Sequence, residues 1–305
     1  MKSAVVTGAN GFLGKTLVKK LLSKGVSVYA IVTNLKDMED INDSKLVSIK
    51  AFYEDYDSLK SSLPKNIDVF YHFAWQGVFG ESFKDYELQL KNAKYTADAV
   101  MIAVSLEIKK FILASTVNTL ETKKYFNMQS FSPRFTNIYA TSKLAAEMIG
   151  KTLAYNHGIE YNCGIIGMVY GENNHSRMIP NIVMSNLLYN RETNLIDGKT
   201  PYDIVYIDDV CDAFIAIAEK GVNFKTYYIG HSEISTFKNI WDQVRSIINP
   251  NGVLNYGFYK ETNAIDYSLI NSSELFEDTG FKPSSDFKTS IINTVKWIEE
   301  SGEFK

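Results

Sequence analysis

Short apolar runs alternate with helical patterns through the first half of the chain. The apolar runs are Ser3–Gly8, Val26–Val32, Ile67–Ala74, Lys109–Ser115 and Tyr161–Gly171. Apolar residues at helical spacing lie between them, from about Phe12, at Asp57–Leu63, at about Phe83–Leu106 and at Tyr139–His157. Because strands that alternate with helices form parallel sheets covered on both faces, this order predicts an α/β fold with a doubly wound parallel sheet.

The second half of the chain is less regular, since prolines and the polar segment 171–177 interrupt it. Further strands are predicted at Glu192–Gly198, Tyr202–Val210 and Thr226–Gly230, and a final helix at Phe287–Glu300. We expect residues 1–170 to form the dinucleotide-binding sheet domain, to which a later segment at about 203–230 returns. Residues 171–305 are expected to form a smaller, interleaved lobe.

The overall charge argues against two classes of partner. The chain has 305 residues, 45% of them hydrophobic, and a formal net charge of −3. This weakly acidic balance suits neither nucleic acid nor an anionic membrane surface. No apolar run reaches the ~18 residues of a membrane span, and the first strand leaves no room for a signal peptide. We therefore expect a cytoplasmic protein with no metal site, in which Cys163 and Cys211 are buried free thiols.

The turn after the first strand has two interpretations. Gly8, Gly11 and Gly14 match the spacing of a dinucleotide-binding turn, whereas Ala9–Thr16 matches a relaxed phosphate loop that ends in Gly-Lys-Thr. In the first interpretation the large apolar residues after Gly11 begin a helix and face the core. In the second they would lie in the phosphate loop, where they gain little burial.

A second segment keeps the phosphate-loop interpretation open. Asp203–Val210 resembles an apolar strand that ends in the acid of a magnesium site. Asp208 is equally suited to cap the start of a helix, with Asp209 favouring the helix dipole. The glycine spacing alone does not distinguish the dinucleotide-binding turn from the phosphate loop, so motifs elsewhere in the chain are needed.

Tyr139 and Lys143 lie one helical turn apart on one face of a predicted helix. A lysine ammonium near a phenol favours the phenolate, so we expect a lowered pKa for Tyr139, which suits proton transfer in an alcohol–ketone conversion. The pair follows an apolar strand that ends in Ser115 and Thr116. Sheet proteins of this kind place site residues at the carboxyl ends of their strands.

Four motifs together resemble one family. They are T-G-x-x-G-x-x-G at Thr7–Gly14, F-Y-H-F-A at Phe70–Ala74, A-S-T at Ala114–Thr116 and Y-A-T-S-K at Tyr139–Lys143. Over nearly its whole length the chain resembles the extended short-chain dehydrogenase/reductase family, and more narrowly its nucleotide-sugar epimerases, dehydratases and reductases. The resemblance implies a Rossmann fold with a substrate-binding lobe, and it favours the dinucleotide interpretation of the glycine turn.

The resemblance implies a role for each matched residue. The cofactor would be held by Gly8, Gly11, Phe12, Leu13, Gly14, Thr33, Asn34, Lys36, Ala74, Tyr139 and Lys143. Thr116 would hold the reacting oxygen, with Ser115 as its substitute. Tyr139 would be the acid/base, and Lys143 would bind the nicotinamide ribose and tune Tyr139. His72 either lies along the cofactor or is a structural histidine, and Asn92 matches an asparagine at the edge of the site.

The end of the second strand departs from the NAD-binding pattern. Family members that prefer NAD usually carry an acid there, whereas this chain has Val32, followed by Thr33 and Asn34. Without a carboxylate a 2′-phosphate meets no repulsion, and Lys36 is available to neutralise it. We therefore expect NADP as the cofactor, with NAD as the alternative, although the usual arginine of the NADP pattern is absent as well.

Two further departures concern the reaction and the substrate. Dehydratases of the family place an acid directly after the Ser/Thr, where this chain has Val117, so we do not expect dehydration. Positions that often contact the substrate diphosphate carry Met168 and Tyr202 instead of asparagine and arginine. Either Arg177 or Arg191 makes that contact, or the substrate is not a standard sugar nucleotide.

We expect an NAD(P)-dependent oxidoreductase that reduces a keto group, at the 4-position, of a nucleotide-linked deoxysugar. The segment His72–Gly77 resembles family members that reduce 4-keto-6-deoxy sugars. The alternatives are an NAD-dependent nucleotide-sugar 4-epimerase, a reductase of a non-sugar carbonyl, and a non-catalytic cofactor sensor. Family members often pair through the two long helices, so we also expect a homodimer.

Overall fold

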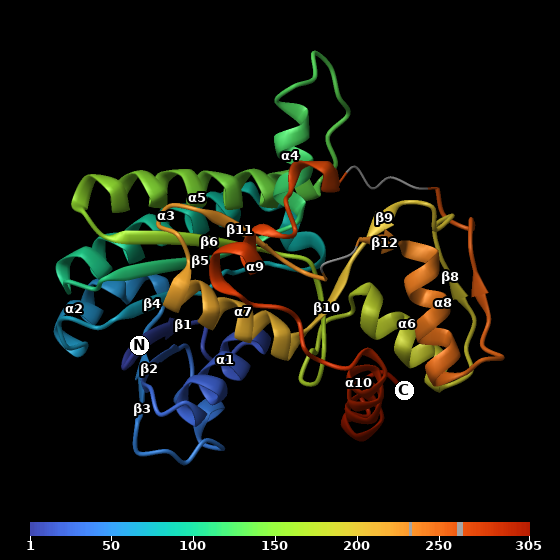
Figure 1. Ribbon diagram of the computed structural model, residues 1–305, viewed down its shortest axis with the longest axis horizontal. Helices are drawn as coiled ribbons and strands as arrows, with labels where there is room; N and C mark the ends of the chain where they lie inside the picture. Colours follow the sequence, from blue (N-terminus) through green and yellow to red (C-terminus); the bar gives the residue numbers. More distant parts are fainter. Residues whose placement is uncertain (232–233, 261–264) are drawn as a thin grey trace.

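A seven-stranded parallel sheet forms the centre of the computed structural model, which describes residues 1–231, 234–260 and 265–305 (Figure 1). The strands are β1 (Ser3–Thr7), β2 (Ser27–Val32), β3 (Leu46–Lys50), β4 (Val69–His72), β5 (Lys110–Thr116), β6 (Glu160–Ile166) and β11 (Thr226–Ile229). They lie in the order β11-β6-β5-β4-β1-β2-β3, and every pairing is parallel. The predicted doubly wound parallel sheet is therefore confirmed.

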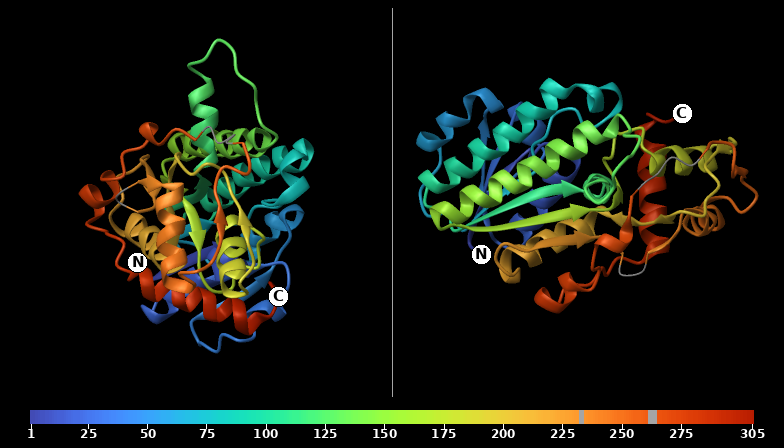
Figure 2. Two further views of the ribbon diagram at one scale, coloured as in Figure 1. Left: turned by 90° about the vertical axis from the view of Figure 1, so that its right-hand side faces the viewer. Right: turned by 90° about the horizontal axis from the view of Figure 1, so that it is seen from above.

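Helices cover both faces of this sheet (Figures 1 and 2). On one face lie α3 (Tyr86–Ser105) and α5 (Thr136–His157), and on the other α1 (Phe12–Ser23) and α7 (Ile207–Lys220). Successive side chains of a strand point to opposite faces of the sheet and so belong to two different cores. Val5 of β1 packs towards α3 and α5, whereas Ala4 and Val6 pack towards α1 and α7. Along α1, Leu17 and Leu21 are fully buried, as the helical spacing predicted.

Three elements of the sheet domain differ from the predictions. Strand β3 was not predicted, because its short alternating sequence lies half exposed at the sheet edge. The predicted helix at Asp57–Leu63 is a 3-10 turn, η2 (Tyr53–Ser58), followed by one α-helical turn, α2 (Leu59–Ser62). A further short helix, α4 (Asn118–Tyr125), follows β5 directly and projects with its loop from the body of the protein (Figure 1).

The second half of the chain forms most of a smaller lobe beside the carboxyl ends of the strands (Figure 1). Its helices are α6 (Ile179–Leu188), α8 (Phe237–Ile248) and α10 (Phe287–Ser301). Its strands form three two-stranded sheets: β7 (Met168–Tyr170) with β10 (Ile204–Tyr206), β9 (Pro201–Tyr202) with β12 (Ser235–Thr236), and β8 (Thr193–Asn194) with β13 (Leu254–Asn255). The fully buried Trp241 lies in its core beside Phe237 and Tyr202. Strand β8 is only the first part of the strand predicted at Glu192–Gly198.

One segment of the second half returns to the sheet domain in addition to α7 and β11. Helix α9 (Glu274–Thr279) packs against α7 and β11, and Leu275 belongs to the core beneath α1 and α7. The remaining short turns are η1 (Leu35–Met38), η3 (Gly80–Lys84) and η4 (Tyr267–Leu269). Cys163 and Cys211 are buried free thiols, as predicted. Among the described helices none has the length and apolar character needed to cross a bilayer.

Candidate active site

The glycine turn between β1 and α1 has no room for side chains. Gly8 has a positive φ of 65°, and a Cβ on it would lie 2.9 Å from the backbone of Ala74. A Cβ on Gly14 would lie 2.1 Å from the carbonyl oxygen of Gly8. The amide of Gly11 donates to that same carbonyl at 3.0 Å, which closes the turn. The glycines therefore bring the first turn of α1 directly against the ends of β1 and β4.

The amino-terminal end of α1 is open to a ligand. Its N-cap is Gly11, and no side chain caps the helix. The first backbone N–H groups of a helix, here those of Phe12 and Leu13, have no partner within the helix and carry the positive end of its dipole. An anion such as a cofactor pyrophosphate fits this end, so the residues present suit a dinucleotide.

The side chains that a phosphate loop would use are engaged elsewhere. The Lys15 ammonium lies 2.7 Å from the Asp40 carboxylate and donates to the carbonyl of Asp37 at 2.7 Å. The Thr16 hydroxyl donates to the carbonyl of Phe12 within the helix. Asp208 pairs with Lys20 at 3.5 Å, and it lies in the first turn of α7 instead of capping it, because the N-cap is Tyr206. This geometry supports the dinucleotide interpretation.

A carboxylate lies close to the end of β2, although none was expected there. Thr33, Asn34 and Lys36 are exposed, and the Asn34 side chain caps the 3-10 turn η1 by accepting from the amide of Lys36 at 3.2 Å. The turn brings Asp37 back towards the glycine turn, where its carboxylate accepts from the side-chain amide of Asn10 at 2.7 Å. The sequence interpretation considered only the strand end and so missed Asp37.

The three candidate catalytic residues come together at the carboxyl end of β5. The Thr116 hydroxyl lies close enough to the Tyr139 phenol to influence its pKa. One turn along α5, the Lys143 ammonium donates to the carbonyl of Ala114 at 2.8 Å, which ties the helix to the strand. Tyr139 and Lys143 are both buried. The arrangement holds a phenol and a hydroxyl side by side, which suits binding and protonation of a carbonyl oxygen.

Burial, and not Lys143, dominates the acidity of Tyr139. It raises the pKa of Tyr139 to about 12, with a smaller opposing contribution from the hydrogen bond to Thr116. Burial also lowers the pKa of Lys143 to about 7. The expected lowering of the Tyr139 pKa is therefore wrong for the protein without ligands. Its physical reason is that loss of hydration penalises both the phenolate and the ammonium.

His72 is a structural histidine. Its Nδ1 lies 3.0 Å from the Thr7 hydroxyl and its Nε2 lies 3.2 Å from the Thr96 hydroxyl. Thr96 donates to the carbonyl of Asn92, so it accepts from Nε2–H, and Thr7 donates to Nδ1. Burial lowers the pKa of His72 to about 3, with a smaller effect from the charge of Lys143. The neutral ring joins β1, β4 and α3.

The segment after β4 forms a wall over the candidate catalytic pair. Trp75 lies with its ring centroid 3.9 Å from the Lys143 ammonium and 6.0 Å from the ring of Tyr139. The indole N–H donates to the side chain of Gln89 at 2.8 Å. Trp75 and Gln89 were not singled out from the sequence. A signal was available, because Gln89 and Asn92 are polar residues one turn apart on the buried face of a helix.

Asn92 fixes the loop that carries Trp75. Its side chain accepts from the amide of Gln76 and donates to the carbonyl of Gln76, both at 2.9 Å. Ala74 lies at the start of the same loop, and its amide donates to Thr7 at 3.3 Å. Ser115, next to Thr116, is buried, and its hydroxyl has no hydrogen-bond partner among the residues that the structure describes. Asn92 thus acts on the loop in this structure, and its predicted role at the edge of the site stays a prediction.

The two arginines proposed for the substrate both lie in the second half of the chain. Arg177 is exposed in the loop before α6. Arg191 donates to the carbonyl of Phe304 near the end of the chain, at 2.7 Å. Tyr202, at the position of an expected arginine, packs edge-on against Phe237 with ring centroids 4.9 Å apart. Met168 belongs to β7 and packs against the core of the lobe. Their roles with a substrate stay predictions.

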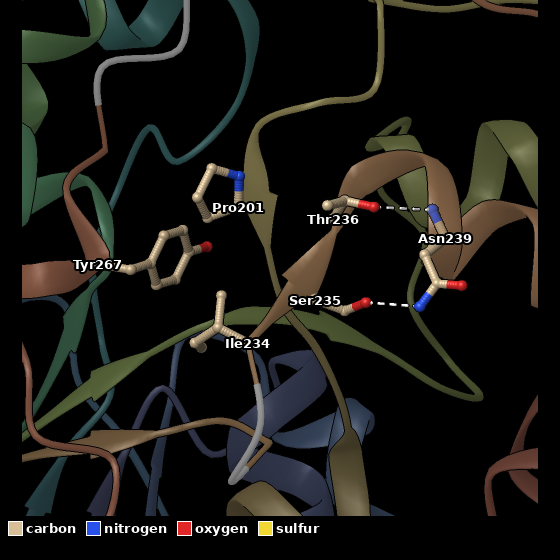
Figure 3. Close-up of a pocket in the computed structure, with 6 residues that line it drawn as sticks. All are labelled: Pro201, Ile234, Ser235, Thr236, Asn239 and Tyr267. Carbon is tan, nitrogen blue, oxygen red and sulfur yellow. Dashed lines mark hydrogen bonds between the residues drawn. The ribbon is translucent and has the colours of Figure 1, made fainter.

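A pocket of about 730 Å³ lies in the lobe (Figure 3). Among the residues that the structure describes, its lining is uncharged and includes Pro201, Ile234, Ser235, Thr236, Asn239 and Tyr267. Tyr267 packs in one cluster with Val117 and Leu120, which directly follow the end of β5. One lining residue of the pocket thus packs against the segment that follows β5.

Residues 4–230 match the sequence profile of the NAD dependent epimerase/dehydratase family. The chain belongs to this family. The resemblance seen in the four motifs is thus confirmed, and the protein is an NAD-dependent enzyme of the short-chain dehydrogenase/reductase type. This membership sets aside both the phosphate-loop interpretation and the non-catalytic sensor.

Relatives within the epimerase/dehydratase family differ in their reactions. A dTDP-D-glucose 4,6-dehydratase of Homo sapiens is 26% identical over 321 residues, covering 98% of this chain and 91% of that protein. A CDP-abequose synthase of Salmonella typhimurium is 24% identical over 305 residues, covering 96% and 97%. The solved UDP-N-acetylglucosamine 4-epimerase of Methanobrevibacter ruminantium has a TM-score of 0.82 at 22% identity, covering 98% and 99%. This last likeness establishes the shared fold.

Proposed function

We propose that the protein reduces a keto group, at the 4-position, of a nucleotide-linked deoxysugar, with NADPH or NADH as the reductant. The observation that carries the proposal is the buried Tyr139 phenol beside the Thr116 hydroxyl. With a pKa raised to about 12, Tyr139 keeps its proton at neutral pH. A protonated phenol is the form that a carbonyl reduction needs, because the product oxygen must gain a proton.

The chain's own residues then have separate tasks. A reduced nicotinamide, when bound, would supply the hydride for the carbonyl carbon. Thr116 donates a hydrogen bond to the carbonyl oxygen and so fixes its position. As the oxygen gains negative charge, Tyr139 transfers its proton to it, which completes the alcohol. Lys143, held by the carbonyl of Ala114, provides a nearby positive charge that favours the phenolate left behind. Trp75 and the buried face of helix α5 keep water from this proton.

Dehydration is disfavoured by the surroundings of Thr116. The next two residues are Val117 and Asn118, which offer no carboxylate for the removal of water. The acid that α4 does carry, Glu121, is fully buried and bound by both Arg134 and Tyr125. A carboxylate held in this way is unsuited to proton transfer at a substrate.

Two observations support a nucleotide sugar as the substrate. The relatives with nearly complete coverage are named for dTDP-linked and CDP-linked sugars. The pocket beside Tyr267 offers an aromatic face and the side-chain amide of Asn239, which suit a nucleobase. Reduction of a non-sugar carbonyl is an alternative, because Met168 and Tyr202 occupy positions that often contact the substrate diphosphate.

A homodimer stays a prediction, supported by the exposed Leu90 on α3 and Met148 on α5.

A 4-epimerase is the second candidate. The same three residues serve both reactions, and Asp37, close to the glycine turn, favours NAD, which an epimerase retains between its two hydride transfers. Incubation with a nucleotide-linked 4-keto-6-deoxysugar and either reduced cofactor tests the first function by loss of nicotinamide absorbance and by the mass of the product. Oxidation of stoichiometric cofactor supports the reductase. Interconversion of 4-epimeric nucleotide hexoses without net cofactor use would instead establish the epimerase.

A further inference from the structure

Two aromatic side chains pack against the ring of the candidate acid/base Tyr139. The ring centroid of Phe83 lies 4.9 Å from that of Tyr139 at an interplanar angle of 62°, and that of Trp75 lies 6.0 Å away at 86°. Both are edge-to-face contacts, which aromatic rings favour. Phe83 belongs to η3 and Trp75 to the loop after β4. Both residues of this aromatic pair are only half-buried, so part of each ring is accessible beside Tyr139.

The fully buried Gln89 on α3 fixes both members of the aromatic pair. Its side-chain oxygen accepts from the indole N–H of Trp75 at 2.8 Å. Its amide group donates to the carbonyl of Gly77 at 2.8 Å and to the carbonyl of Ser82, the residue before Phe83, at 3.0 Å. The two rings are therefore held in place by bonds that do not depend on a substrate.

The surface that the aromatic pair presents to a substrate is apolar. A phenyl ring carries no polar atom, and the indole N–H is already donated to Gln89. The lysine of η3, Lys84, is bound by Glu81 at 2.8 Å and lies over the ring of Phe135, 5.3 Å from its centroid. A hydroxyl group pressed against the aromatic pair would lose its water without gaining a partner, whereas a methyl group would be buried favourably.

We propose that Trp75 and Phe83 bind the C6 methyl group of a 6-deoxysugar and so select it over the sugar that carries a C6 hydroxyl. The inference rests on the proposed function, because it takes the reacting oxygen to be at C4 and bound by the Tyr139 phenol. C4 is joined to C5, which carries C6, so an oxygen held at the phenol brings C6 close to the rings that flank Tyr139. An apolar site rejects an added hydroxyl by roughly 10²-fold at most, which sets the size of the expected preference.

A competing role for the aromatic pair is purely structural, to hold the ring of Tyr139. A structural role would affect stability and the binding of both sugars alike, whereas recognition of the methyl group changes the ratio of the two affinities. Phe83 separates these roles more cleanly than Trp75, because Trp75 also contacts the ammonium of Lys143.

Calorimetric titration of the full chain with dTDP-glucose and with dTDP-6-deoxyglucose tests the proposal, because the two probes differ by one hydroxyl. Reduced cofactor is added at saturation, since it cannot oxidise these alcohols and so permits binding without turnover. The CDP-linked pair is titrated in the same way. The wild-type protein is expected to bind the 6-deoxysugar about 10- to 100-fold more tightly than its parent sugar.

Variants of Phe83 then assign the preference to the aromatic pair. Phe83→Gln places hydrogen-bonding groups beside the sugar and should bring the ratio of the two affinities close to one. Phe83→Leu keeps an apolar surface and should retain most of the preference. Phe276→Gln is the matched control, since it replaces an exposed phenyl group on α9 and should leave the ratio unchanged. Thermal melting confirms that each variant is folded, and Trp75→Gln provides the same test where Phe83→Gln does not fold.

Three results would overturn the proposal. They are equal or weaker binding of the 6-deoxysugars by the wild-type protein, an unchanged ratio in the folded glutamine variant, and binding of none of the four probes. Failure of the proposed function looks different, because the preference for 6-deoxysugars would then persist while no 4-keto-6-deoxysugar is reduced. Conversely, reduction of a keto sugar without any preference for the 6-deoxy form would retain the function and reject the role of the aromatic pair.

Discussion

The ammonium of Lys143 lies 3.9 Å from the centroid of the Trp75 indole ring. An aromatic face attracts a cation, and the attraction is stronger where water is excluded. Trp75 therefore partly offsets the burial that lowers the pKa of Lys143 to about 7. The indole is itself fixed by Gln89, so Trp75 helps to hold the Lys143 ammonium at the end of β5, where it donates to Ala114.

Replacing Trp75 by leucine should shift the pH dependence of turnover. Without the aromatic face the charged form of Lys143 loses support, so the loss of activity on raising the pH should begin about one unit lower. Trp75→Phe keeps a weaker aromatic face and should lie between the two. The measurement is kcat against pH for the three proteins. Identical profiles would show that Trp75 acts on Lys143 only through packing.

Tyr139→Phe should reduce turnover by about 10³-fold, because proton transfer contributes roughly that much. Cofactor binding, followed by nicotinamide fluorescence, should persist, since the glycine turn is unchanged. Tyr95→Phe is a suitable control, as it removes a hydroxyl that bonds Glu54 on the surface away from Thr116. Turnover near the wild-type rate in Tyr139→Phe would remove this residue from the mechanism.

Asn92→Ala should loosen the loop that carries Trp75. The change leaves both the amide and the carbonyl of Gln76 without their partner, at a cost of about 1–3 kcal/mol in the free energy of unfolding. Because the loop lies over Tyr139, we also expect kcat to fall. Thermal melting and steady-state kinetics check the two effects. Asn92→Asp keeps the acceptor but loses the donor, so it should recover only part of the stability.

The doubly wound parallel sheet could be predicted because strands and helices of the first half differ in apolar period. The glycine turn and the pair Tyr139–Lys143 were accessible in the same way, since both depend on spacing within one element. Contacts between residues far apart in the sequence could not be predicted. Asp37 reaches Asn10 only because η1 folds back, and the contact of Trp75 with Lys143 depends on the path of the loop after β4.

The Tyr139 pKa illustrates the same limit. Spacing alone brings the lysine near the phenol and predicts a lowered pKa. Whether the effect of the charge or that of burial dominates depends on how much water reaches Tyr139, which only the folded protein determines. Likewise, the sequence left two roles open for His72, and its two threonine partners on β1 and α3 decide in favour of the structural one.

His72 should contribute to acid sensitivity. Its pKa is lowered to about 3 in the folded protein, against 6.5 ordinarily, so between these pH values the unfolded chain binds the extra proton. Stability from this group therefore falls as the pH drops below 6.5, by about 2–3 kcal/mol at pH 4.5. His72→Gln should unfold with a shallower pH dependence in urea titrations. His157→Gln, at the exposed end of α5, controls for the loss of one histidine, and equal slopes in all three proteins would contradict the assignment.

Lys143→Met should separate activity from stability. The pKa of Lys143 is lowered to about 7 in the folded protein, against 10.5 ordinarily, so below pH 7 the native state must hold a buried ammonium. Methionine removes that cost but also the bond to Ala114, and we expect a net gain of about 2 kcal/mol at pH 6. Between pH 7 and 10.5 the unfolded wild-type chain binds the extra proton, so wild-type stability rises and the advantage of the variant disappears. Urea unfolding at pH 6 and pH 9 measures this difference. A variant that is less stable than the wild type at both pH values would show that the bonds of Lys143 fully offset the cost of burying its ammonium. Loss of turnover is expected whichever stability is found.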